Sequence, residues 1–242
     1  MAHYPKAPIT EALIDLQVRL PAAITSETLR DVRGAREAQF PSASELKRAY
    51  IEFRVGEGQA ATGTAEQAGW IFRSSDDKRV AQARLDGFTF SRLAPYDRWE
   101  TLRAEAQEFW SDYRRVASPE AITRVGIRYI NRFDLPLPFA DLKDFFRTTP
   151  EVSPAMPQEL AGFFMQLQVP YPDLQAMLVL TQTLVPPPQI DVASVVLDIG
   201  FSCANNVPQE DTAIWHLLEQ FRVKKNEVFE ACITDAAREL IR

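Results

Sequence analysis

The sequence predicts an α+β protein built largely on antiparallel sheet, with helices packed on one face. Residues 12–20 and 122–133 alternate between apolar and polar side chains, which is typical of strands with one buried face. Two long stretches, 97–116 and the one that starts near 211, instead repeat apolar residues at the spacing of an amphipathic helix. Short polar turns separate the remaining apolar runs, and the Asp86-Gly87 pair is a strong hairpin signal.

The elements of the first half follow in order from these patterns. The strand at 12–20 precedes a helix that Thr25 or Ser26 caps and that ends near Gln39, before Pro41. Alternation at 46–55 predicts another strand, and 56–67 is expected to be a flexible connection. Three short strands at 69–73, 79–85 and 88–93 lead into the helix at 97–116.

The second half begins with the strand at 122–133. A short helix near 139–146, a proline-rich loop at 148–160 and three strands at 163–169, 175–185 and 190–201 follow. A long helix begins at Asp211 or Thr212, and Thr234 marks a fresh helix start. We expect one compact module over 1–242, with a possible topological repeat of halves 1–117 and 118–242, because each half runs strand, helix, strands, helix.

Composition and charge exclude several classes of protein. Hydrophobic residues make up 46% and charged residues 25% of the 242 residues, which predicts a globular protein. A net charge of −6 argues against a general nucleic-acid coat, although a local basic patch remains open. The sequence has neither a secretory signal nor an apolar run of membrane-spanning length, so we expect a soluble cytoplasmic protein without a membrane partner. Cys203 and Cys232 fit a reducing compartment, and a single bridge between them is the alternative.

Motifs for catalysis, cofactors and metals are missing from the sequence. The two histidines, His3 and His216, have no neighbours at metal-ligand spacing. The glycines of residues 56–63 lack the following Gly-Lys-Ser/Thr of a phosphate-binding loop. We therefore predict no catalytic residue, no cofactor and no metal, and we expect a binding protein rather than an enzyme.

The strand at 122–133 carries the candidate binding residues. Arg124, Arg128 and Arg132 share one face, where their guanidinium groups could hold the phosphate or carboxylate of a small anionic ligand. In the alternative, each arginine pairs with a carboxylate of a neighbouring strand. Asn131 shares the opposite, apolar face, so we predict a buried hydrogen-bonding role for its amide.

Four carboxylates complete the candidate site. Glu11, Asp15 and Glu52 lie on predicted wet faces and are the expected partners of the arginines, Glu11 being retained as a binding residue. Asp198 lies within an apolar run, where a charge is costly unless it is paired. It is therefore either a structural ion-pair partner or an acid–base group.

Several segments are similar to a known family. Tyr-Pro-Lys-Ala-Pro-Ile-Thr-Glu-Ala from residue 4, Gly-Ile-Arg-Tyr-Ile-Asn from 126 and Phe-Glu-x-x-Ile-Thr-Asp from 229 occur in this order. This resembles a sporadically distributed family of functionally uncharacterised prokaryotic proteins of about this length, except that Ala7 stands where that family has a second proline. The resemblance implies one full-length module in a prokaryotic cytoplasm, and no activity or site.

Three functions remain open on the sequence. We expect a binding or interaction module, such as an accessory or regulatory subunit of a complex, whose partner is another protein or a second copy. An alternative is an enzyme acting on phosphate- or nucleotide-containing substrates, with Arg124 and Arg128 as anion clamps and Glu11 or Asp198 as general base. Another is specific nucleic-acid recognition by an open sheet face.

Overall fold

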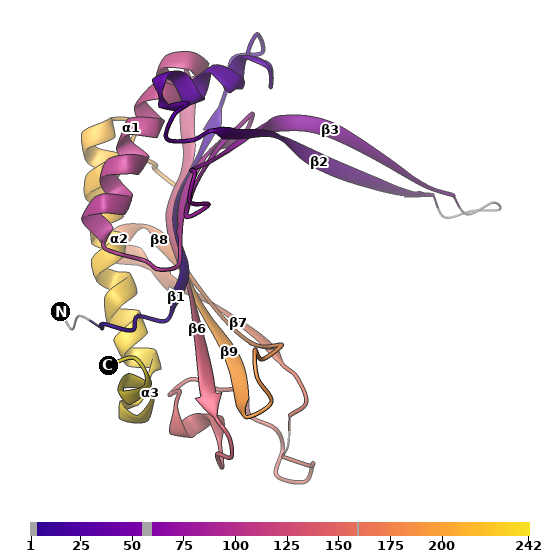
Figure 1. The fold of residues 1–242 in the computed structure, drawn as a ribbon, viewed down its shortest axis with the longest axis vertical. Helices are drawn as coiled ribbons and strands as arrows, with labels where there is room; N and C mark the ends of the chain where they lie inside the picture. The colour runs from indigo at the N-terminus through magenta and orange to yellow at the C-terminus, as the bar shows by residue number, and fades with distance from the viewer. Residues whose placement is uncertain (1–3, 55–59, 159) are drawn as a thin grey trace. The chain divides into compact units, whose positions relative to one another are not determined.

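The computed structural model describes residues 4–54, 60–158 and 160–242, with only the backbone of 49–54 and 60–64. In these ranges nine strands are hydrogen-bonded in the order β2-β3-β4-β5-β1-β6-β9-β8-β7 as an open antiparallel sheet, which confirms the predicted α+β class (Figure 1). The elements are β1 (Ile9–Arg19), η1 (Thr28–Arg36), β2 (Ser42–Arg54), β3 (Ala60–Arg73), β4 (Arg79–Arg84), β5 (Gly87–Leu93), α1 (Trp99–Ala117), β6 (Ala121–Pro136), η2 (Leu142–Asp144), β7 (Phe164–Tyr171), η3 (Pro172–Leu174), β8 (Ala176–Val185), β9 (Val192–Cys203), α2 (Asp211–Cys232) and α3 (Asp235–Leu240).

Backbone contacts divide the chain into two compact units. The β2–β5 unit consists of Asp15–Arg92 and Arg98–Thr123, and the β6–β9 unit consists of Met1–Ile14, Leu93–Asp97 and Arg124–Arg242. None of the helices in the described part of the chain is long and apolar enough to cross a membrane. Cys203 and Cys232 are both buried free thiols, so the bridge between them does not form.

The core of the β2–β5 unit is aromatic. Helix α1 buries residues that recur every three or four positions, among them Leu102, Phe109 and Tyr113. Phe109 meets Phe40 edge to face, with ring centroids 4.7 Å apart. The C-cap of the helix is Ser118, which has a left-handed φ of 43° and is followed by Pro119.

Two predictions for the β2–β5 unit were wrong. The predicted helix near residues 25–39 is the 3-10 helix η1, interrupted at Gly34, where φ is 51°. Strand β3 begins at Ala60 and pairs with β2 as far as Arg54, so most of the predicted connection at 56–67 is strand, and its residues 56–59 lie outside the described ranges. Pairing along β2 outweighs the weak strand preference of the glycine and alanine residues in this segment.

The β6–β9 unit packs α2 against its strands. The α2 helix contacts β9, and stacked rings of Phe201 and Phe221 lie 5.9 Å apart between them. Phe133 on β6 meets Phe146 and Phe229, with centroids 5.3 and 6.2 Å away. The short helix predicted near 139–146 is only the single turn η2, which begins with a capping box at Asp141.

Candidate functional site

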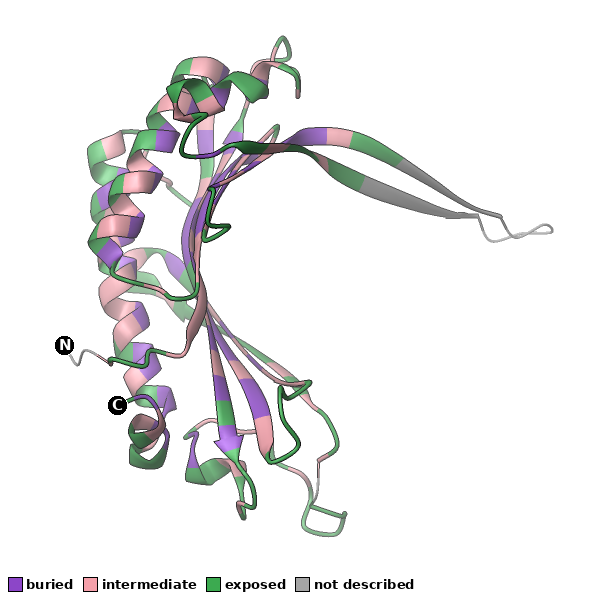
Figure 2. Ribbon diagram, in the orientation of Figure 1, coloured by how far each residue is buried: buried purple, intermediate pink, exposed green. Residues whose placement is uncertain are grey.

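Strand β6 presents four of the five predicted site residues on its two faces, and Glu11 lies on β1. Tyr129, Asn131 and Phe133 are buried, whereas Ile130 and Arg132 between them are partly exposed. In Figure 2, β6 accordingly carries both the buried and the exposed colour along its length. The strand is therefore half-buried: its Tyr129 face packs against α2, and its Arg128 face is more exposed. All five predicted binding residues belong to the β6–β9 unit.

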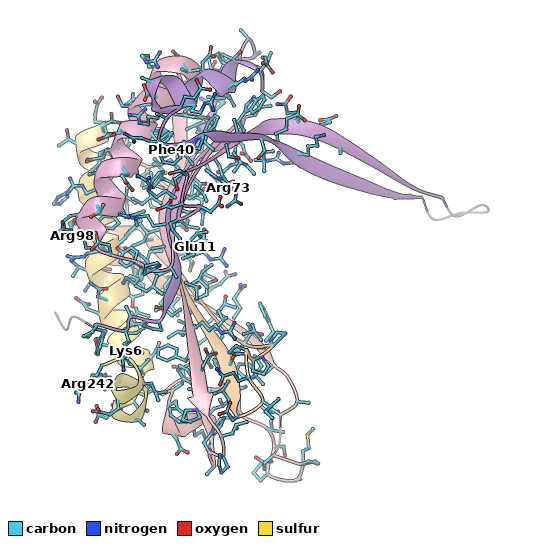
Figure 3. All side chains as sticks on the ribbon, in the orientation of Figure 1. Lys6, Glu11, Phe40, Arg73, Arg98 and Arg242 are labelled. Atoms are coloured by element: carbon cyan, nitrogen blue, oxygen red, sulfur yellow. The ribbon has the colours of Figure 1, made fainter. Side chains whose placement is uncertain are left out.

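Arg128 forms a two-pronged ion pair with Asp198 on β9. Its Nε lies 2.9 Å from both carboxylate oxygens of Asp198, and its Nη2 also donates to Oδ2. The side chain of Asp198 is 9% exposed and that of Arg128 52% exposed. Hydrogen bonding to Asp198 raises the pKa of Arg128, which burial opposes and the charges of Asp198 and Glu11 assist. Glu11 lies on β1 (Figure 3).

Arg132 has partners along β6 and on β9. Its Nε donates to Oδ1 of Asp134 at 2.9 Å, and its Nη2 donates to Oγ of Ser194 at 2.9 Å and to the carbonyl of Pro186 at 3.2 Å. Burial alone would raise the pKa of Asp134, but hydrogen bonds from Ser194 and Arg132 lower it. Arg132 is thus held by a network of its own, separate from Arg128.

The arginines therefore do not form a row of bare cations. Arg128 and Arg132 each have a carboxylate partner, and a phosphate would have to compete with it. Arg124 lies on the same strand and is partly exposed. Of the other carboxylates, Asp15 pairs with Arg84 at 2.9 Å in the β2–β5 unit, and the side chain of Glu52 lies outside the described residues. Asp198 is the ion-pair partner of Arg128, which corresponds to the first of the two roles considered from the sequence.

Asn131 makes one buried hydrogen bond to the neighbouring strand β9 and one within β6. Its Nδ2 donates to the carbonyl of Leu197 on β9 at 3.0 Å and to that of Tyr129 at 3.3 Å. Only 2% of the residue is exposed. The amide therefore fixes the β6–β9 pairing on the helix-facing side.

The sequence patterns missed Lys225 on α2. This residue is 8% exposed, and its Nζ lies 3.8 Å from the centroid of the Tyr129 ring. Burial, assisted by the charge of Arg222, lowers the pKa of Lys225 to about 7. A lysine on the apolar stripe between Phe221 and Phe229 is the signal that could have revealed it.

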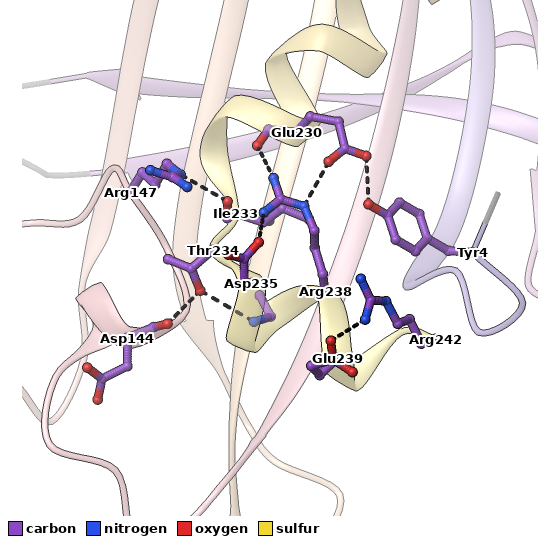
Figure 4. A network of polar contacts seen from close by, with 11 residues as sticks. Tyr4, Asp144, Arg147, Glu230, Ile233, Thr234, Asp235, Arg238, Glu239 and Arg242 are labelled. Atoms are coloured by element: carbon purple, nitrogen blue, oxygen red, sulfur yellow. Dashed lines mark hydrogen bonds and ion pairs between the residues drawn. The ribbon is translucent and has the colours of Figure 1, made fainter. Parts of the chain in front are cut away.

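A network of polar contacts joins both ends of the chain within the β6–β9 unit (Figure 4). The Tyr4 hydroxyl donates to Oε1 of Glu230 at 2.7 Å, and Nε of Arg238 donates to Oε2 of the same carboxylate at 3.0 Å. Thr234 caps α3 by accepting from the backbone N–H of Ala237 at 3.4 Å. The network ties the start of the chain to α2 and α3, which is a structural role.

No group of three or more potential metal ligands occurs among the residues that the structure describes. A comparison with protein-family models gave no match, and neither did a search of curated protein sequences.

Proposed function

We propose that this protein is a binding module that associates through strand β7, and that the partner is a second copy of the chain. The supporting observation is that β7 is the last strand of the sheet and is exposed. None of its eight residues, all of which the structure describes, is buried, and Phe164 is 70% exposed. A terminal strand also has one row of backbone groups without a neighbouring strand, which is where another chain can pair.

The apolar face of the core extends onto β7. Leu178 and Leu180 on β8 are 4% and 5% exposed. Leu178 is the register partner of Phe201 on β9, whose ring stacks on Phe221 of α2, so these leucines share the helix-facing side. Their register partners on β7 are Val169 and Leu167, which are 40% and 38% exposed. The row of apolar side chains thus continues one strand beyond the region that is covered, and an added chain would cover it.

Charge distinguishes β7 from the strand at the other end of the order. Strand β2 carries Glu45, Lys47 and Arg48, and charged side chains on a terminal strand discourage pairing with another chain. The sequence of β7, Phe-Met-Gln-Leu-Gln-Val-Pro-Tyr, contains no charge. Two copies of β7 could therefore pair antiparallel around a twofold axis without like-charge repulsion.

The experiment measures molar mass by light scattering after size-exclusion chromatography. The wild type should approach the dimer mass as its concentration rises to about 100 μM, a range that detects associations of roughly 5–6 kcal/mol. Leu167→Lys places a charge on the helix-facing row and should return the mass to that of a monomer.

Gln168→Lys is the matched control, because Gln168 lies on the other face of the same strand and is exposed. It should weaken association less than Leu167→Lys does. A wild type that stays monomeric throughout the concentration range would contradict the proposal, as would a dimer that Leu167→Lys leaves intact.

A further inference from the structure

The backbone of strand β7 alternates between groups that bond to β8 and groups that face away from it. The register pairs Phe164 with Thr183, and in the preceding pair the N–H of Leu184 donates to the carbonyl of Phe163 at 3.4 Å. In an antiparallel ladder, a hydrogen-bonded pair is followed by a pair whose backbone groups point away from each other. The N–H and C=O of Phe164 therefore face the outer edge of β7, at the end of the strand order.

The same alternation identifies the outward backbone groups along the whole strand, because β7 pairs with β8 residue by residue from Phe164 to Tyr171. These groups belong to Phe164, Gln166, Gln168 and Pro170. The first three residues supply both an N–H and a C=O, whereas Pro170 supplies only a C=O, because proline has no backbone N–H. A proline is tolerated within a sheet where its nitrogen faces away from the neighbouring strand, as it does here.

These outward groups restrict how a second β7 can pair antiparallel with the first. Outward residues must lie opposite outward residues, and a twofold axis places one residue of the strand opposite its own copy. Centring the pairing on Gln166 or on Leu167 gives every outward N–H an acceptor. A centre nearer either end of the strand leaves at least one outward N–H without an acceptor in the opposite strand, which costs free energy.

Side chains on the helix-facing side favour the register centred on Leu167. In that register Leu167 lies opposite its own copy and Met165 lies opposite Val169, so the whole apolar row beside Leu180 is paired. These pairs are the ones without hydrogen bonds between them, in which side chains approach each other most closely. Centring on Gln166 instead leaves the half-exposed Val169 without a strand residue opposite it.

The other face of β7 favours the same register. Phe164 is 70% exposed, and it lies opposite Pro170 of the second copy when Leu167 is on the axis. With Gln166 on the axis it would lie opposite Gln168, and an aromatic ring removes more apolar area from water against a proline ring than against an amide. In the register centred on Leu167, the amides of Gln166 and Gln168 face each other and can exchange hydrogen bonds.

We infer that two copies of β7 pair antiparallel with Leu167 on the twofold axis. Each chain then aligns Phe164 with Pro170 of the second copy. This inference rests on the proposed association through β7 and goes beyond it, because it specifies which residues of the two copies meet. The competing register, centred on Gln166, shifts one strand by two residues against the other.

The test is disulfide cross-linking of the full chain by oxidised glutathione, with single cysteines introduced on β7. Leu167→Cys should link to its own copy, because directly opposite residues in such a pair have Cα atoms about 4.5 Å apart, within the range of a disulfide. Gln166→Cys should link to its own copy about 10-fold more slowly, because the two cysteines are diagonal neighbours about 7–8 Å apart. An equal mixture of Gln166→Cys and Gln168→Cys should link faster than either variant alone.

Controls separate the register from the association itself. The wild type, oxidised in parallel, measures any background from the buried thiols of Cys203 and Cys232. A wild type that light scattering shows to be monomeric would overturn the proposed association and the register with it. A dimer in which Gln166→Cys links to itself at least as fast as Leu167→Cys would overturn the register and leave the association standing.

The glutamine variants keep the test decisive if Leu167→Cys fails to associate, because they leave the apolar row of β7 unchanged. In that case the mixture of Gln166→Cys and Gln168→Cys should still link faster than Gln166→Cys alone. A mixture that links no faster than Gln166→Cys alone would overturn the register centred on Leu167.

Discussion

Two buried charged residues, Asp198 on β9 and Lys225 on α2, are accommodated in opposite ways. Asp198 lies almost enclosed in the sheet face, and the guanidinium of Arg128 compensates its charge with a two-pronged contact. The amine of Lys225 lies against the ring of Tyr129 and forms no ion pair within the described part of the chain, and burial lowers its pKa. Removing either Arg128 or Asp198 should therefore lower the stability of the fold, whereas Lys225 lowers stability whenever its amine is charged.

Arg128→Met should lower the free energy of unfolding by about 1–3 kcal/mol, because it leaves the enclosed carboxylate of Asp198 without its partner. Replacing both residues, as Arg128→Met with Asp198→Leu, should recover part of this loss. Urea titration measures each value. The control is Arg19→Met, which breaks an exposed pair with Glu120 and should cost less than about 1 kcal/mol. Equal losses for Arg128→Met and Arg19→Met would contradict the structural role of Asp198.

Lys225→Met should stabilise the protein at pH 6. The folded pKa near 7 lies below the 10.5 of an ordinary lysine, so the unfolded chain binds the extra proton between these values. The wild type therefore gains stability as pH rises from 7 to 10.5, and it carries the full penalty below 7. We expect a gain of about 1–3 kcal/mol for Lys225→Met at pH 6, shrinking toward pH 10.

Urea titrations of Lys225→Met at several pH values provide this measurement. Lys224→Met is the control, since Lys224 is paired at the surface and should show no such gain. A loss of stability in Lys225→Met at pH 6 would show that the buried amine is compensated.

At the scale of the element, alternation and helical spacing predicted most of the strands and the long helices, because these patterns record which face is buried. The same alternation placed Arg128 and Asn131 on opposite faces of β6, as the structure has them. The pairing of Arg128 with Asp198 was not predictable, because strand register is a long-range property. The start of β3 at Ala60 was not predictable either, because it depends on pairing with β2. The interruption of η1 arises from the non-helical φ of Gly34.

Substitution of Gly69 probes how closely the backbones of β3 and β4 approach each other. Its φ is 151°, and an added Cβ would lie 2.0 Å from the carbonyl oxygen of Ala83. Because that atom belongs to the backbone, Gly69→Ala should destabilise the protein by about 3 kcal/mol or more in urea titration. The control is Gly162→Ala, whose added carbon would meet nothing within 4 Å. Equal stability of the two variants would contradict the β3–β4 geometry.

At the scale of the whole molecule, strand β7 leaves an apolar row that the described part of the chain does not bury. The β6–β9 unit buries Leu178 and Leu180 on β8 but leaves their neighbours Val169 and Leu167 on β7 half-exposed. The strand carries no charge that would discourage pairing. We infer that association covers this row, and that the solution state of the protein depends on concentration.

Amide hydrogen exchange across Phe164–Tyr171, measured as a function of protein concentration, tests this claim most directly. Outward-facing backbone N–H groups of β7 exchange readily in a monomer and become hydrogen-bonded when a second β7 pairs with them. Exchange in this segment should slow as the wild type is concentrated, whereas exchange in Leu167→Lys should not change with concentration. Exchange in β7 that is equally fast at every concentration would contradict this claim.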